Sequence, residues 1–118
     1  MIRLNQYPFK EEYTYYMLQA LKAGKKGAFR KDFLDLHPTD QAAIFIELDS
    51  SRRRRVYPFL SPAEFVKIFS RLALAMQKRC LLELDRRYVI DMLNELPSAD
   101  AAYFSGLHTH QEADFAPV

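Results

Sequence analysis

The stretch FRKDFLDLHPTDQAAIFIELDSSRRRRVYPFL, residues 29–60, carries the pattern that predicts the fold of this 118-residue chain. Leucine stands at every twelfth position: Leu36, Leu48, Leu60, Leu72, Leu84 and Leu96. Three and four residues before the later leucines stand apolar pairs: Ile44/Phe45, Val56/Tyr57, Ile68/Phe69, Cys80/Leu81 and Met92/Leu93. Because residues at i, i−3 and i−4 share one face of a helix, each unit predicts a short helix with one apolar stripe.

One continuous helix cannot use this pattern. Twelve residues make about 3.3 turns, so the stripe would rotate by about a third of a turn in every unit. The chain is therefore expected to break near each leucine. Capping residues and prolines stand at most of these places: His37-Pro38, Asp49-Ser50-Ser51, Ser61-Pro62, Asp85 and Pro97-Ser98. The position after Leu72 has no such residue, and Pro58 is expected to end or kink its helix near Tyr57.

Helices of about 8–10 residues are not stable alone in water, so neighbouring units must stack on one another. We predict an all-α fold, an α-solenoid-like superhelix of roughly seven to eight short helices, wound to the right or to the left. Residues 11–107 form this stack, with a loose N-terminal arm at 1–10 and a loose C-terminal tail at 108–118. The first helix, residues 11–23, should turn Tyr13 and Tyr16 inward and end before Gly24.

The composition of the chain argues against several classes of functional site. Three glycines disfavour glycine-rich phosphate-binding loops, and a single cysteine, Cys80, excludes an internal disulfide and reads as a small buried side chain. No apolar run approaches the ~20 residues of a membrane span, and residues 1–12 lack the apolar core of a signal peptide. A cytoplasmic protein is expected. Residues 52–87 hold ten Lys/Arg and three Asp/Glu, net +7, whereas residues 88–118 hold five acids and no Lys/Arg, net −5.

From Ala28 to Leu107 the chain resembles the cytosolic N-terminal domain of MgtE-type magnesium transporters. The shared pattern is an apolar helix, His37-Pro38 with Asp40, a second helix ending at Leu48, and short helices repeating after it. The resemblance implies a regulatory module that precedes CBS domains and a membrane part, with magnesium bound between the N-terminal and CBS parts. The middle repeat of the flagellar motor switch protein FliG is similar, which leaves a flagellar-switch-like assembly module as the alternative.

The resemblance also implies acidic ion ligands, and this chain departs from that pattern. The family often begins its last repeat with two adjacent acids and a third one turn later, but here only Asp100 stands in the matching segment. A carboxylate often used in the middle helix corresponds to Lys67. We hypothesise that the chain keeps the fold and has lost or moved the ion site. Asp91, Glu95 and Asp100 are the candidate ligands for weakly bound magnesium.

Charged and aromatic residues supply the candidates for protein docking: Arg52, Arg55, Arg71 and Tyr15. Arg52 and Arg55 align on a helix, and the run Arg52–Arg55 has two other interpretations, a solvated face or a nucleic-acid grip. The partner is expected to be a protein, such as CBS domains or a membrane transporter part of the same polypeptide. Contact between the basic and acidic ends would also permit a homo-oligomer, whereas nucleic acid is disfavoured because no reading motif accompanies the arginines.

Other polar residues have simpler interpretations. His37 should cap the helix that starts at Pro38, and Asp40 should lie in its first turn. An extended tail would place four polar side chains on one side, where they could hold a divalent ion: His108, His110, Glu112 and Asp114. The alternative interpretation is a flexible acidic tail. No set of nucleophile, base and oxyanion donors is recognisable, so no catalytic residue and no enzymatic activity are expected.

Overall fold

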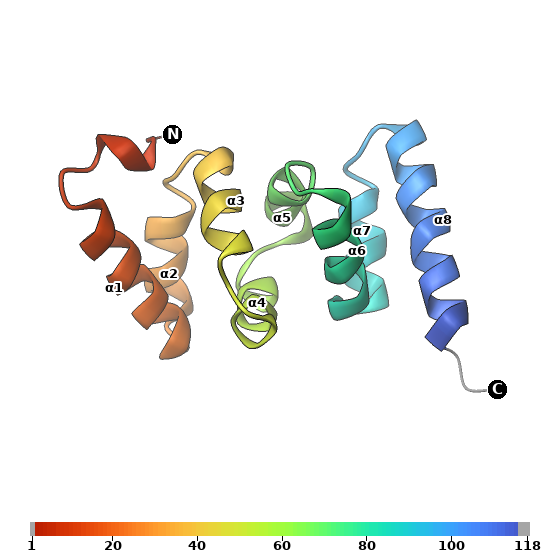
Figure 1. Cartoon of the computed structure of the whole chain (residues 1–118), viewed down its shortest axis with the longest axis horizontal. Coiled ribbons are helices and arrows are strands. Elements are labelled where there is room, and N and C mark those ends of the chain that lie inside the picture. Colours follow the sequence, from red (N-terminus) through yellow and green to blue (C-terminus); the bar gives the residue numbers. More distant parts are fainter. Residues whose placement is uncertain (1, 116–118) are drawn as a thin grey trace. The chain divides into compact units, whose positions relative to one another are not determined.

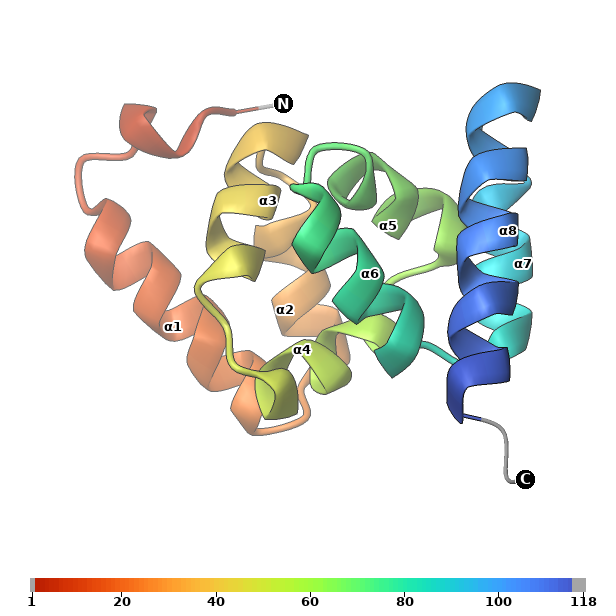
Figure 2. The ribbon, with the colours of Figure 1, turned by 45° about the vertical axis from the view of Figure 1, so that its right-hand side comes forward.

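The computed structural model describes the backbone of residues 2–115 and the side chains of residues 2–113, and this part of the chain holds helices and no strand (Figure 1). The all-α prediction is confirmed. The chain divides into two compact units, Met1–Ser61 and Pro62–Val118. The first unit contains α1 (Lys10–Lys22), α2 (Lys26–Phe33), α3 (Pro38–Ile46) and α4 (Ser50–Val56), with 3₁₀ turns at Leu4–Gln6 and Tyr57–Phe59. The second contains α5 (Pro62–Phe69), α6 (Leu74–Glu83), α7 (Arg86–Leu93) and α8 (Ser98–Phe115), and α8 packs on α6 and α7 (Figure 2).

The helices begin where the sequence predicts breaks. The side chain of His37 accepts a hydrogen bond at Nδ1 from the Thr39 N–H, at 3.1 Å, and Asp49 and Asp85 cap α4 and α7 in the same way. Pro58 lies in the 3₁₀ turn that follows α4, as expected of a residue that ends a helix. The break after Leu72 is also present, although Ala73 offers no capping side chain to α6.

The twelve-residue ladder forms the core of both units. Leu36, Leu48, Leu60, Leu72 and Leu84 are buried, Leu96 is half-buried, and all ten residues of the apolar pairs are buried. Cys80 is fully buried, as its place in the ladder predicts. The stripe weakens in α8, where Tyr103 is 54% exposed.

Gly24 ends α1 in the left-handed conformation, with φ of 73°. The N–H of Lys25 donates to the Ala20 carbonyl at 2.9 Å, and the N–H of Gly24 donates to the Leu21 carbonyl at 3.2 Å. This is the Schellman motif, and the glycine is needed because other residues are strained at this φ.

The prediction of loose ends is wrong for the residues that the structure describes. The N–H of Ile2 donates to the Asp35 carbonyl, the N–H of His37 donates to the Ile2 carbonyl, and Arg3 pairs with Asp40 at 2.9 Å. These bonds hold the N-terminal segment against the start of α3.

At the other end, α8 continues through residues 108–115 because this segment has no helix breaker and packs on α6. Gln111 Nε2 donates to the Lys78 carbonyl at 3.2 Å, and His108 is buried. The rest of the predicted tail, residues 116–118, lies outside the described residues.

Tyr16 is also not where the stripe placed it. Its side chain is 67% exposed, because Met17 and Leu21 fill the contact that α1 makes with α2 and α4. The ring of Tyr16 instead meets the ring of Tyr15 edge-on, with centroids 5.4 Å apart.

Three buried polar side chains share one position of the repeat, five residues after a ladder leucine: Gln41, Arg53 and Gln77. Each donates to a carbonyl at the end of the preceding helix or just after it. Gln41 Nε2 donates to the carbonyls of Phe33 and Leu36, both at 3.0 Å. Arg53 Nη1 donates to the Leu48 carbonyl at 2.8 Å, and Gln77 Nε2 donates to the Phe69 carbonyl at 2.9 Å. We call these side chains the carbonyl clamps, because they donate hydrogen bonds to backbone carbonyls that have no i+4 amide partner where a helix ends.

Candidate docking surfaces

The predicted docking arginines Arg52 and Arg55 lie beside the last turn of α1. Arg55 Nη1 donates to the Lys22 carbonyl at 3.0 Å, which orients its guanidinium group. The side chain of Arg52 is exposed and has no hydrogen-bond or ion-pair partner among the described residues. A pocket of about 180 Å³ opens between these groups. It is lined by Leu18, Leu21, Lys22, Asp49, Ser51, Arg52 and Arg55.

Tyr15 belongs to the same surface. Tyr15, Leu18 and Lys22 stand at i, i+3 and i+7 of α1, so they share one face of the helix. The ring of Tyr15 is 58% exposed. We define the basic surface as Tyr15, Lys22, Arg52 and Arg55. Tyrosine and arginine are among the residue types most enriched at the energetic centres of protein interfaces, so this combination suits protein docking.

The fourth predicted docking residue, Arg71, is not part of the basic surface. It lies in the second unit just after α5, where its Nη1 donates at 2.7 Å to the carbonyl of Lys67 in the last turn of α5. The structure thus groups three of the four predicted docking residues.

The arginine run is not one uniform solvated face. Arg53 is only 4% exposed and is one of the carbonyl clamps, whereas Arg52, Arg54 and Arg55 are exposed. The signal for this was present in the sequence, because Arg53 stands in the same position relative to Leu48 as Gln41 does to Leu36.

The acidic candidates for magnesium are not brought into one cluster. Asp91 Oδ2 faces Arg87 Nε at 3.4 Å, Glu95 is exposed after α7, and Asp100 is exposed in the first turn of α8. Among the described residues, no three His, Cys, Asp or Glu side chains gather closely enough to hold a metal ion. Magnesium prefers near-octahedral oxygen coordination, and these three residues do not provide a shared site for it.

The interpretation of residues 108–114 as an extended tail is wrong, because they are helical. Residues two apart on a helix point to opposite sides, so His108 and His110 do not converge. His108 Nε2 instead lies 3.3 Å from Glu112 Oε1, one turn further along. The side chain of Asp114 lies outside the described residues.

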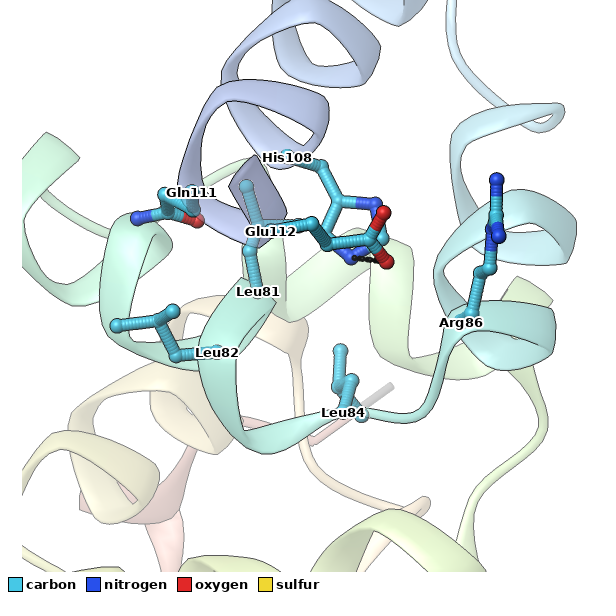
Figure 3. A pocket seen from close by; sticks show the side chains of 7 residues that line it. All are labelled: Leu81, Leu82, Leu84, Arg86, His108, Gln111 and Glu112. Carbon is cyan, nitrogen blue, oxygen red and sulfur yellow. Dashed lines mark ion pairs between the residues drawn. The ribbon is translucent and has the colours of Figure 1, made fainter. Parts of the chain in front are cut away.

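The His108–Glu112 pair overlooks a second pocket, of about 320 Å³, between α6 and α8 (Figure 3). Its lining residues are Leu81, Leu82, Leu84, Arg86, His108, Gln111 and Glu112. Figure 3 shows the leucines on one side and Arg86 across from the pair. The lining contains no hydroxyl or thiol that could act as a nucleophile, so this pocket supplies hydrophobic contact and two opposite charges.

A third pocket, of about 290 Å³, lies between α7 and α8. Its lining is mostly apolar: Val89, Ile90, Leu93, Asn94, Ala101, Ala102, Ser105 and His108. We call it the α7–α8 pocket. Glu95 and Asp100 adjoin it in the chain, since they follow Asn94 and precede Ala101.

Within residues 2–115, none of the helices combines the length and apolarity needed to cross a bilayer. The longest, α8, contains His108, His110 and several acids and has an exposed polar surface.

Comparison with known proteins identifies relatives that match most of the chain. Residues 36–112 match the family described as MgtE intracellular N domain. The chain is 31% identical over 99 residues to the magnesium transporter MgtE of Enterococcus faecalis, a match that covers 84% of this chain and 20% of that protein. The crystal structure of the soluble part of a magnesium transporter superposes with a TM-score of 0.73 at 30% identity, covering 82% of this chain and 39% of that one. The chain therefore spans about a fifth of the length of the curated relative it matches.

Proposed function

Because the chain belongs to the family of MgtE intracellular N domains, we propose that it is a non-enzymatic, cytoplasmic regulatory module that docks on another protein through its charged surfaces. The match at residues 36–112 covers the twelve-residue ladder, which runs through both units. Transport itself is not proposed, since the chain corresponds to a small part of the transporter.

The observation that carries the docking proposal is the basic surface. Arg55 is held by the Lys22 carbonyl, and Arg52 and Lys22 project cationic groups that have no partner within the described residues. A preorganised guanidinium loses less conformational entropy when it binds a carboxylate, and two arginines can each bind one in a bidentate manner. An acidic face of a CBS-domain pair, or of another transporter part, is the partner that this chemistry fits.

Binding to a purified CBS-domain pair from an MgtE-type transporter tests this proposal. We expect calorimetric binding that weakens between about 0.05 M and 0.5 M salt, because screening shortens the range of surface charges. The double variant R52E/R55E should bind at least about tenfold more weakly than the parent. The control K10E/K31E has the same change of net charge, on exposed lysines elsewhere in the first unit, and should bind like the parent. Equal affinity of both double variants would contradict the proposal.

We also propose that this module no longer senses magnesium through the family's ligands. Lys67 is exposed where the family often has a carboxylate, Asp100 stands without the acids that usually accompany it, and the described residues assemble no acidic cluster. A positively charged Lys67 repels a divalent cation. Thermal melts with millimolar magnesium, millimolar calcium and matched ionic strength should therefore coincide. A rise of several degrees with magnesium alone would overturn this, since selective binding to the folded state must stabilise it.

A further inference from the structure

We infer that a second copy of this chain is a partner of the basic surface, and that it docks through its α7–α8 pocket and the acids beside that pocket. This inference rests on the proposed function in one respect: both require the basic surface to be a docking surface. It commits to an occupant that the family resemblance does not supply.

The basic surface offers two kinds of contact. Lys22 and Arg52 provide cationic groups without partners in the described part of the chain, and Arg55 is already oriented. Tyr15 lies on the same face of α1 as Lys22 and adds a ring that is 58% exposed. Tyrosine is the kind of anchor that fills a pocket on a partner surface, because it buries much area and loses little entropy.

The α7–α8 pocket offers the complementary features. It is a mostly apolar hollow of about 290 Å³, and Ile90 in its wall is 47% exposed. Glu95 and Asp100, which adjoin it, are exposed, and neither carboxylate has a partner among the described side chains. A hollow large enough for a ring is therefore flanked in the chain by two exposed carboxylates, which can pair with guanidinium groups.

The charge distribution favours this pairing over contact between like surfaces. Residues 88–118 contain no Lys or Arg, so no cation from that segment opposes the basic surface. The nearest basic residues on α7 are Arg86 and Arg87, at its opposite end, and Arg87 faces Asp91.

Sedimentation of the purified full chain over a wide concentration range tests the inference. We expect the weight-average mass to rise with concentration at low salt and to fall toward the monomer at high salt. R52E/R55E and E95K/D100K should each weaken self-association about tenfold or more when measured alone. An equal mixture of the two variants should associate again, because the reversed surface of one then fits the reversed surface of the other.

Matched controls separate docking from folding and from net charge. K10E/K31E has the same charge change as R52E/R55E and should still self-associate. Y15A should weaken association, whereas Y16A, which removes a neighbouring ring that is 67% exposed, should not. R52E alone keeps the bond between Arg55 and Lys22, so its circular dichroism and urea midpoint should match the parent even if the double variant is less stable.

The outcomes are distinguishable from those that test the proposed function. If the chain is monomeric at every concentration while R52E/R55E still loses binding to CBS domains, the second-copy inference is wrong and the docking proposal stands. If R52E/R55E alters neither kind of binding, both are wrong. Association of each charge-reversed variant alone at the parent's strength also overturns the inference.

Discussion

Replacement of Gln41 by leucine tests whether the carbonyl clamps stabilise the ladder. Gln41 is 3% exposed and donates hydrogen bonds to two carbonyls, those of Phe33 and Leu36. The two carbonyls differ in whether they accept a second hydrogen bond. The Phe33 carbonyl also accepts from the Leu36 N–H at 3.2 Å, whereas among the described residues the Leu36 carbonyl accepts only from Gln41. In Q41L, loss of the bond to the Phe33 carbonyl therefore costs about 1 kcal/mol of stability. Loss of the bond to the Leu36 carbonyl leaves a buried acceptor without a partner and costs about 1–3 kcal/mol. The added apolar burial of leucine returns about 1 kcal/mol, so we expect a net loss of about 2 kcal/mol.

Gln77 provides the matched control. Its acceptor, the Phe69 carbonyl, also receives the Leu72 N–H at 3.1 Å, so Q77L leaves no acceptor unpaired. Its stability should stay within about 0.5 kcal/mol of the parent. Urea unfolding followed by far-ultraviolet circular dichroism measures both variants, and a loss of about 2 kcal/mol corresponds to a midpoint shift of about 1–2 M. If Q41L and Q77L lose equal stability, or if Q77L loses more, the reasoning from unpaired carbonyls is refuted.

Two further predictions concern the backbone and one carboxylate. G24A should lose about 1 kcal/mol of folding stability because Gly24 has a φ of 73°, although a Cβ there would have open space. G106A should gain about 0.5–1 kcal/mol of stability, because Gly106 lies inside α8 and a Cβ there would also have open space. Urea midpoints of the two variants that move in the same direction would contradict this. Burial raises the pKa of Asp40, but hydrogen bonds from Arg3 and the Leu4 N–H outweigh it and hold the pKa below its ordinary value of 3.8. The ionised carboxylate therefore stabilises the fold above pH 3.8. D40N should be less stable than the parent at pH 7, and the difference in stability should shrink as the pH falls through the lowered pKa of Asp40. A difference in stability that does not depend on pH would exclude this electrostatic origin.

The core could be predicted because it follows from local spacing. Each ladder leucine and its pair lie within one turn of a helix, so their common face does not depend on knowing which helices touch. The helix starts at His37, Asp49 and Asp85 were predictable for the same reason, since a cap bonds an N–H only two or three residues away.

Features that depend on contacts between helices were not predictable in this way. The burial of Arg53 was hidden because a run of four arginines resembles a solvated face, and only alignment with Gln41 and Gln77 reveals its clamp position. The helical state of residues 108–115 was missed because the ladder fades in α8, where the helix is fastened by Gln111 and His108 and not by a full apolar stripe.

The basic surface illustrates the same limit. Tyr15 and Arg52 are 37 positions apart, and their neighbourhood arises from the packing of α1 on α4. The sequence period indicates that both helices exist, but it contains no information on which pairs of helices meet. The docking residues could be named singly, and their grouping required the structure.

The carbonyl clamps have a consequence for how such arrays change in evolution. Each clamp reaches back only five to eight residues, so the polar demand at the end of a helix is met inside its own segment of chain. A duplication or deletion of one whole segment would carry its donor and its acceptor together and would strand neither. Lengthening or shortening of the array by complete segments is thereby tolerated, whereas an insertion of a few residues between a leucine and its clamp would separate the two and should be eliminated by selection.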